Sequence, residues 1–120
     1  MNISIKKVID FGHNTERIEF LILSNCNISY YLVSDTTFVT PDKISNKLRH
    51  IYWFPSKDVK RGDEIVLYTK KGINKSESIN SGQNTRYIFY WGLESFVWNN
   101  SGDSAVLFEL NTWKTTKIIN

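Results

Sequence analysis

Two histidines and one cysteine are the residues of this sequence whose chemistry could support catalysis. Histidine acts as a general base near neutral pH, and a cysteine thiolate is a strong nucleophile once a base activates it. His13 and His50 fall in or beside predicted loops, without an acidic or nucleophilic neighbour in a recognised pattern. Cys26, flanked by Asn25 and Asn27, is typical of a small half-buried thiol. We therefore predict no catalytic residues and no enzymatic activity.

Metal and phosphate sites have equally little support in the sequence. Zinc needs three or four ligands, and one cysteine and two histidines spread along the chain fall short of that set. Residues 99–103 could offer oxygen ligands to Ca²⁺, although Asp103 is the only carboxylate among them. The alternative is a structural turn, with Gly102 at positive φ and Asp103 capping backbone N–H groups, and Gly62 with Asp63 predicts a second turn of this kind. We prefer the turns and expect no metal and no cofactor.

The elements that must position these residues are short β-strands, because Ile, Val, Phe and Tyr dominate segments that alternate or stay apolar. The pattern predicts strands in segments 3–11, 16–24, 28–35, 49–55, 64–69, 87–92, 94–99, 104–110 and 113–119. A single helical turn is predicted in segment 41–50, and segment 70–86 is predicted to be a long mobile loop because it has hardly any apolar residues. Eight or nine short strands separated by turn signals indicate an all-β, antiparallel β-sandwich or barrel.

Length and composition fit one domain spanning residues 1–120. The chain has 120 residues, of which 41% are hydrophobic and 22% charged, so it can bury a core without disulfides. A single cysteine is typical of a reducing compartment. The first residues lack the apolar core of a signal peptide, and no apolar run is long enough to cross a membrane. We expect a cytoplasmic protein.

Positive charge is concentrated in residues 41–75, which hold nine Lys or Arg against four Asp or Glu, while the whole chain carries +3. Such a region could attract an anionic partner. Lys70, Lys71, Lys75 and Arg86 are interleaved with aromatic side chains, and nucleic acids bind where cations meet phosphates and aromatic rings stack on bases. Nucleic-acid binding through residues 41–75 and the loop 70–86 is therefore one hypothesis.

The aromatic residues, 14% of the chain, have a second explanation in the core. Alternation along the segment 87–92 places Tyr87, Phe89 and Trp91 on one face, which would fill a sandwich core. Any aromatic side chain left outside would suit a protein interface, where tyrosine and tryptophan are enriched. The candidates for this binding surface are Tyr31, Tyr52 and Tyr90.

A family resemblance supports the fold. The sequences IYWFPSKDVKRGDEIVLYTKKG (51–72) and YWGLESFVWNNSGDSAVLFELN (90–111), separated by a variable loop, resemble the lamin-tail domain. The matching features are the Phe54-Pro55 pair, the turn from Val59 to Gly62 and the turn before the apolar strand at 104–110. The resemblance implies an immunoglobulin-like sandwich, and it carries turn and strand markers rather than catalytic signatures.

Three functions remain open at this stage. The preferred one is a non-catalytic binding or assembly module of lamin-tail type, which would contact a protein partner or a second copy of the chain. The first alternative is the nucleic-acid-binding domain described above. The second is a carbohydrate-binding domain or small hydrolase, for which Trp53 and Trp113 would be the sugar-stacking rings.

Overall fold

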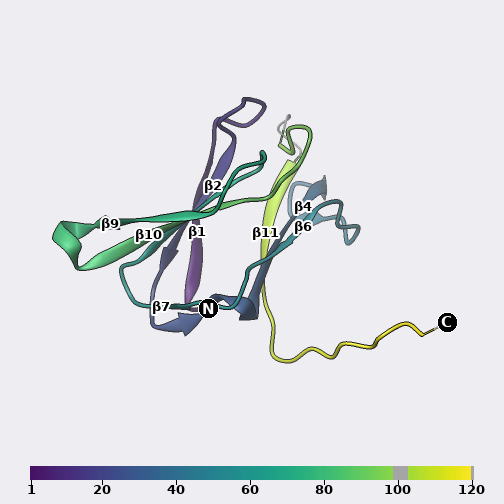
Figure 1. The fold of residues 1–120 in the computed structure, drawn as a ribbon. Helices are drawn as coiled ribbons and strands as arrows, with labels where there is room; N and C mark the ends of the chain where they lie inside the picture. Colours follow the sequence, from purple (N-terminus) through teal and green to yellow (C-terminus); the bar gives the residue numbers. More distant parts are fainter. Residues whose placement is uncertain (99–102, 120) are drawn as a thin grey trace.

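The computed structural model describes residues 1–98 and 103–119, and strands dominate it (Figure 1). The strands are β1 (Ile3–Ile9), β2 (Arg17–Ile22), β3 (Cys26–Asn27), β4 (Tyr31–Thr40), β5 (Lys43–Ile44), β6 (Ile51–Trp53), β7 (Asp58–Val59), β8 (Glu64–Tyr68), β9 (Lys75–Ile79), β10 (Asn84–Tyr90) and β11 (Asp103–Glu109). The two helical elements in these ranges are 3₁₀ turns, η1 (Ile28–Tyr30) and η2 (Asn80–Gly82). A mostly β chain is therefore confirmed. No helix in the described ranges is long and apolar enough to cross a membrane.

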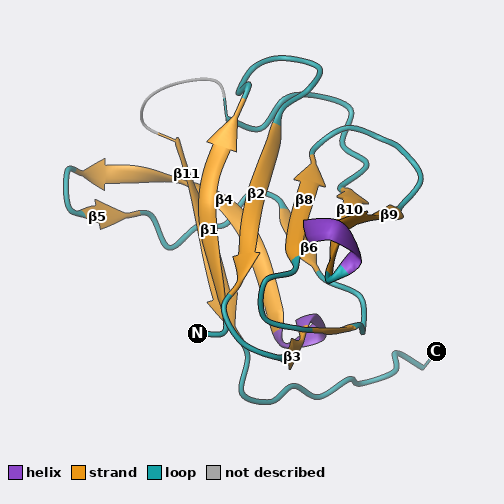
Figure 2. Ribbon diagram, turned by 90° about the vertical axis from the view of Figure 1, so that its left-hand side faces the viewer, coloured by secondary structure: helices purple, strands orange, loops and turns teal. Residues whose placement is uncertain are grey.

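Most strands belong to two sheets. The large sheet has the order β1-β2-β8-β10-β9, and in the small sheet β4 pairs with β11 and with β6, while β5 pairs with the end of β4 (Figure 2). The expectation of purely antiparallel pairing is wrong at one place, because β10 pairs with β8 in parallel. A parallel pair needs a long connection, and here the chain supplies one by forming β9 before it returns as β10.

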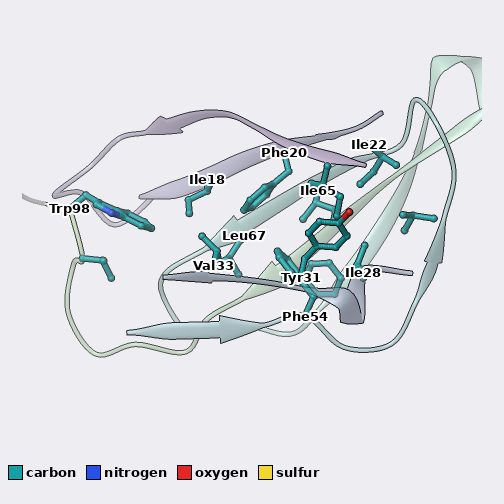
Figure 3. Packing of buried hydrophobic residues seen from close by; sticks show 14 residues of the cluster. Ile18, Phe20, Ile22, Ile28, Tyr31, Val33, Phe54, Ile65, Leu67 and Trp98 are labelled. Atoms are coloured by element: carbon teal, nitrogen blue, oxygen red, sulfur yellow. The ribbon is translucent and has the colours of Figure 1, made fainter. Parts of the chain in front are cut away.

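The core lies between the two sheets (Figure 3). Strand β2 alternates as predicted and buries Ile18, Phe20 and Ile22, each at most 1% exposed. From the small sheet, Tyr31 and Val33 on β4 face this row. The core residues on all elements are Ile3, Ile18, Phe20, Ile22, Ile28, Tyr31, Val33, Phe54, Val59, Ile65, Leu67, Phe89, Val97 and Trp98. The rings of Phe20 and Phe54 meet edge to face at 5.5 Å, a favourable geometry for aromatic pairs.

The predicted turn at Gly62 and Asp63 is confirmed. Gly62 has a φ of +90°, and Asp63 accepts hydrogen bonds from the backbone N–H groups of Lys60 (2.9 Å) and Thr85 (3.0 Å) and from the side chain of Asn84 (3.0 Å). Burial raises the pKa of Asp63, but these hydrogen bonds outweigh it and hold the pKa below its usual value. The second predicted turn, at Gly102, lies outside the described residues.

Two loop predictions are wrong. Segment 41–50 forms no helical turn; it contains β5, which forms a projecting hairpin with the end of β4 (Figure 2). Segment 70–86 is not one long loop, because it contains β9 in a hairpin with β10 (Figure 1). Strand β9 has the sequence KSESI and leaves its first four residues exposed. A polar edge strand of this kind carries no apolar alternation for sequence analysis to detect.

Two predicted strands are absent. Residues 113–119 are exposed and join no strand, and residues 94–98 form an irregular segment that nevertheless buries Val97 and Trp98. A buried carboxylate explains the second case. Glu16, 1% exposed, accepts hydrogen bonds from the backbone N–H groups of Val97 (2.8 Å) and Trp98 (3.1 Å) and from the hydroxyl of Thr69 (2.9 Å). These bonds satisfy the backbone that a strand partner would otherwise satisfy.

Candidate binding surface

The outward side of the small sheet carries five apolar side chains, which we call the outer face: Leu32, Ile51, Trp53, Val106 and Phe108. The strand register places them in two adjacent rows. Trp53 on β6 and Phe108 on β11 both lie opposite Leu32 on β4, while Ile51 and Val106 both lie opposite Ser34. Because neighbouring residues across strands point to the same side of a sheet, these side chains form one continuous patch.

Alternation shows that this patch is separate from the core. The neighbours of these residues along the strands, Val33, Tyr52 and Leu107, lie opposite one another and pack in or against the core. None of the five residues of the outer face belongs to the core cluster. Ile51 and Trp53 are 53% and 47% exposed. The outer face is thus apolar surface that the fold itself does not use.

Residues 45–50 cover the part of the same sheet face that lies around Ser34 and Thr36. Ser34 donates its hydroxyl to the backbone carbonyl of His50 (2.7 Å), and Thr36 donates to the carbonyls of Ser45 and Lys47 (both 3.0 Å). Segment 45–50 therefore lies over this end of β4 and buries both hydroxyl side chains completely. The cover reaches the row of Ile51, Ser34 and Val106, and the row of Trp53, Leu32 and Phe108 lies beyond it.

An aromatic rim adjoins the outer face. The ring of Trp113, beyond the end of β11, meets the rings of Trp53 and Tyr30 edge to face at 5.1 and 5.2 Å. The indole N–H of Trp53 donates to the carbonyl of Ser29 (2.7 Å), which fixes that ring in place. All three rings are between 43% and 47% exposed. They extend the apolar surface past the end of the small sheet where β4 begins and β11 ends.

The outward side of the large sheet carries ion pairs beside apolar side chains such as Val66 and Ile88, each 7% exposed. Arg86 on β10 lies between Glu64 (2.9 Å) and Glu77 (2.7 Å), and on β2 Arg17 approaches Glu19 (3.6 Å). The hydrogen bonds to Glu77 and then Glu64 raise the pKa of Arg86. A hollow of about 330 Å³ lies on this side, lined mainly by charged residues and by the side chains of β2, β8 and β10. Two of its cations, Arg17 and Arg86, are already paired with carboxylates of the chain.

The predicted surface tyrosines have different environments. Tyr31, a candidate for the binding surface, is instead buried: it is 1% exposed, and its hydroxyl donates to Glu109 and accepts from the backbone N–H of Asn2 (3.0 Å). Burial, followed by the hydrogen bond to Glu109, raises the pKa of Tyr31 to about 12. Tyr52 is half-buried and packs edge-on against Phe54 at 5.2 Å. Tyr31 and Val33 point toward the core. The sequence alone could not show which side of this strand faces inward.

The predicted cations are spread over the large sheet and its loops. Lys71 pairs with Glu94, and Lys70 lies over the ring of Tyr68, 5.4 Å from its centre. Tyr90 also stacks on Tyr68, with the two ring centres 5.3 Å apart. Lys75 begins β9 and is exposed. The structure therefore brings Lys70 and Tyr90 around one tyrosine ring, while Arg86 is held by carboxylates.

One histidine has an acidic neighbour that sequence analysis missed. The ring Nδ1 of His50 lies 3.0 Å from Asp35 Oδ1, and Arg49 pairs with both Asp35 (3.1 Å) and Asp103 (3.1 Å). A buried carboxylate beside an imidazole is the usual orienting pair of a general base. Here the adjacent hydroxyl, that of Ser34, donates to the His50 backbone and not to its ring. The cluster ties segment 45–50 to β4 and β11.

The remaining candidates for chemistry lie apart. Cys26 is half-buried, and burial followed by the charge of Glu109 raises the pKa of its thiol, which disfavours the reactive thiolate. His13 lies in the turn between β1 and β2, where its backbone carbonyl accepts from Glu16 N–H (2.9 Å). Within the described ranges, no group of three or more His, Cys, Asp or Glu side chains could hold a metal ion.

No family model matches this chain, and no curated protein matches it.

Proposed function

We propose that this chain is a non-catalytic binding and assembly module of lamin-tail type, built as an immunoglobulin-like β-sandwich, with the outer face of the small sheet as its contact surface. The outer face carries this proposal. Ile51 and Trp53 lie half-exposed beside the partly exposed Leu32, Val106 and Phe108, and none of the five belongs to the core. Contiguous apolar surface on a folded domain marks an interaction site, and tryptophan is a frequent anchor at such sites.

Two features of the fold are compatible with this proposal. Two sheets pack over one core, and Gly62 forms a turn at positive φ. The parallel β8–β10 pair differs from a purely antiparallel sandwich. The proposal therefore depends on the surface rather than on the family.

The two alternative functions have less support in the described residues. Phosphate binding requires cations that are free to pair with phosphates, whereas two of the four predicted cations, Arg86 and Lys71, already pair with glutamates. Sugar binding often uses aromatic rings that together form a flat platform. Trp53 and Trp113, the two candidates, pack edge to face with their planes at 89° and so do not form one platform. We therefore keep protein binding as the single proposal.

Photocrosslinking in cells tests this function. A benzoylphenylalanine at position 51 should form an adduct with one defined protein, either a second copy or a different chain. The same group at position 73 should form none, because Ile73 is equally apolar and 88% exposed but lies on the loop before β9. Binding of the identified partner should then weaken at least about tenfold in Ile51→Lys. Equal adducts at both positions, or none at position 51, would contradict the proposal.

A further inference from the structure

The segment that follows β11, residues 111–119, is the second unexplained apolar feature of the molecule, and we call it the arm. It joins no strand, and every one of its residues is exposed. Ile118 and Ile119, near its end, are 90% and 84% exposed. Figure 1 shows the arm passing the end of β11 and running away from both sheets. Its sequence WKTTKII is rich in strand-forming residues, although it pairs with no strand in residues 1–98 and 103–119.

The arm starts at a fixed point. The backbone N–H of Leu110 donates to the carbonyl of Tyr30 (2.7 Å), and Trp113 packs against Trp53 and Tyr30. These contacts hold the root of the arm at the rim of the outer face. The six residues after Trp113 can extend about 20 Å beyond that point.

The outer face and the arm are complementary in chemistry and belong to the same chain. The face is an open apolar sheet surface, and the arm presents isoleucines that leave their own domain. From this pairing, and on the premise of the proposed function, we propose that the partner is a second copy of this chain. The two outer faces pack together across a two-fold axis, and each arm lies across the face of the other copy.

The area involved is of the size that a stable dimer needs. Ile51, Trp53, Trp113, Ile118 and Ile119 are between 43% and 90% exposed. Together they expose roughly 600 Å² of side-chain surface per copy, before the half-buried members of the face are added. Stable interfaces bury about 800 Å² per partner. A two-fold arrangement pairs the same surface of both copies, so no copy of that surface remains free to bind a third chain.

Charge does not oppose this arrangement. The five side chains of the outer face are all uncharged, and the two cations of the arm, Lys114 and Lys117, are exposed. Each lysine can keep its ammonium group in water while its methylene stem lies on the apolar surface. The charged side of the large sheet then remains in solvent, where its ion pairs already satisfy one another.

Sedimentation equilibrium of the full chain tests the dimer. The unmodified protein should be dimeric at micromolar concentration. Ile51→Lys and the double variant Ile118→Lys/Ile119→Lys should each raise the dissociation constant at least about tenfold. Ile73→Lys is the matched control, because it places the same change at an exposed isoleucine outside both features, and it should remain dimeric. Circular dichroism verifies that each variant folds.

Cysteine pairing tests the exchange of arms. In a Cys26→Ser background, a copy with Ile51→Cys is mixed with a copy with Ile119→Cys. A disulfide between the two copies on oxidation is expected, and its absence in Ile73→Cys mixtures is the control. When both cysteines are in one chain, the crosslinked product should have the mass of a dimer. A crosslinked monomer would overturn the exchange, since the arm would then cover its own face.

The two proposals fail in different ways. A chain that is monomeric at all concentrations overturns the dimer. If position 51 still crosslinks to a different protein in cells, the proposed function stands without it. A dimer that persists in Ile51→Lys also overturns the inference, because that dimer would use another surface.

Discussion

The outward sides of the two sheets of this chain differ in kind. On the large sheet, Arg86 lies between Glu64 and Glu77, and Arg17 pairs with Asp10 and approaches Glu19. On the small sheet, the corresponding position is occupied by the apolar outer face. Both sides are built on strands of the same period and face away from the same core. The comparison shows ion pairs within the chain on one side and partly exposed apolar side chains on the other, and the second observation is the basis of the proposed contact surface.

The largest difference in stability is expected between inward-facing and outward-facing positions that carry the same residue type, because their burial differs. Ile65, on the inner side of the large sheet, is fully buried, and Ile51 is 53% exposed. Ile65→Ala should lower the free energy of unfolding by about 2–5 kcal/mol, because it leaves a cavity. Ile51→Ala should lower it by less than about 1 kcal/mol. Urea denaturation of dilute protein measures both; equal losses would mean that the outer face is part of the core.

Tyr31 sharpens the comparison within a single strand, because it is buried while its neighbour Leu32 lies on the outer face. Its pKa is raised to about 12, above the ordinary value of 10. Because the pKa of Tyr31 is higher in the folded than in the unfolded chain, its protonated hydroxyl contributes fully to stability below pH 10. That contribution is lost as the pH rises toward 12. The loss should reach about 2–3 kcal/mol.

Urea denaturation between pH 9 and pH 12 measures this loss. Other tyrosines and lysines titrate in the same range, so the readout is the difference between the unmodified protein and Tyr31→Phe. The variant should lack the additional drop in the free energy of unfolding. Parallel pH profiles would show that the Tyr31 hydroxyl ionises as easily in the folded chain as in the unfolded one.

Arg86 tests the charged side. Arg86→Met should lower the free energy of unfolding by about 1 kcal/mol or less, because partly exposed ion pairs contribute little and Glu64 and Glu77 are left without their shared cation. The difference should shrink in 1 M salt, since salt screens these charges. Thermal denaturation at low and high salt measures it. A larger loss that salt does not change would indicate a packing role for the arginine stem.

The smallest effect is expected at the predicted phosphate-binding lysines. Neutralising Lys70, Lys71 and Lys75 to glutamine should change the affinity for a single-stranded oligonucleotide by less than about twofold. Fluorescence anisotropy between 50 and 200 mM salt measures this. A steep fall of affinity with salt in the unmodified protein, lost in the triple variant, would favour nucleic-acid binding instead.

Local patterns in the sequence identified the elements that bury one face. The alternation of Ile18, Phe20 and Ile22 predicts β2 correctly, and Gly62 with Asp63 predicts its turn. The same reasoning missed β9, because KSESI is exposed, and it predicted a strand at 113–119 that the single chain does not form. Strand propensity indicates that a segment can adopt a strand, but the strand forms only where a partner strand is present.

The sequence by itself determined that this chain is mostly β and where apolar side chains alternate, because a period of two is a local property of the backbone. Only the tertiary structure decided which side of each strand is inside. Tyr31 and Trp53 both occur in apolar alternating segments, yet one is buried and the other is half-exposed. The register of β4 with β6 and β11 joins residues up to 78 positions apart, such as Tyr31 and Glu109, and no local pattern encodes such a pairing.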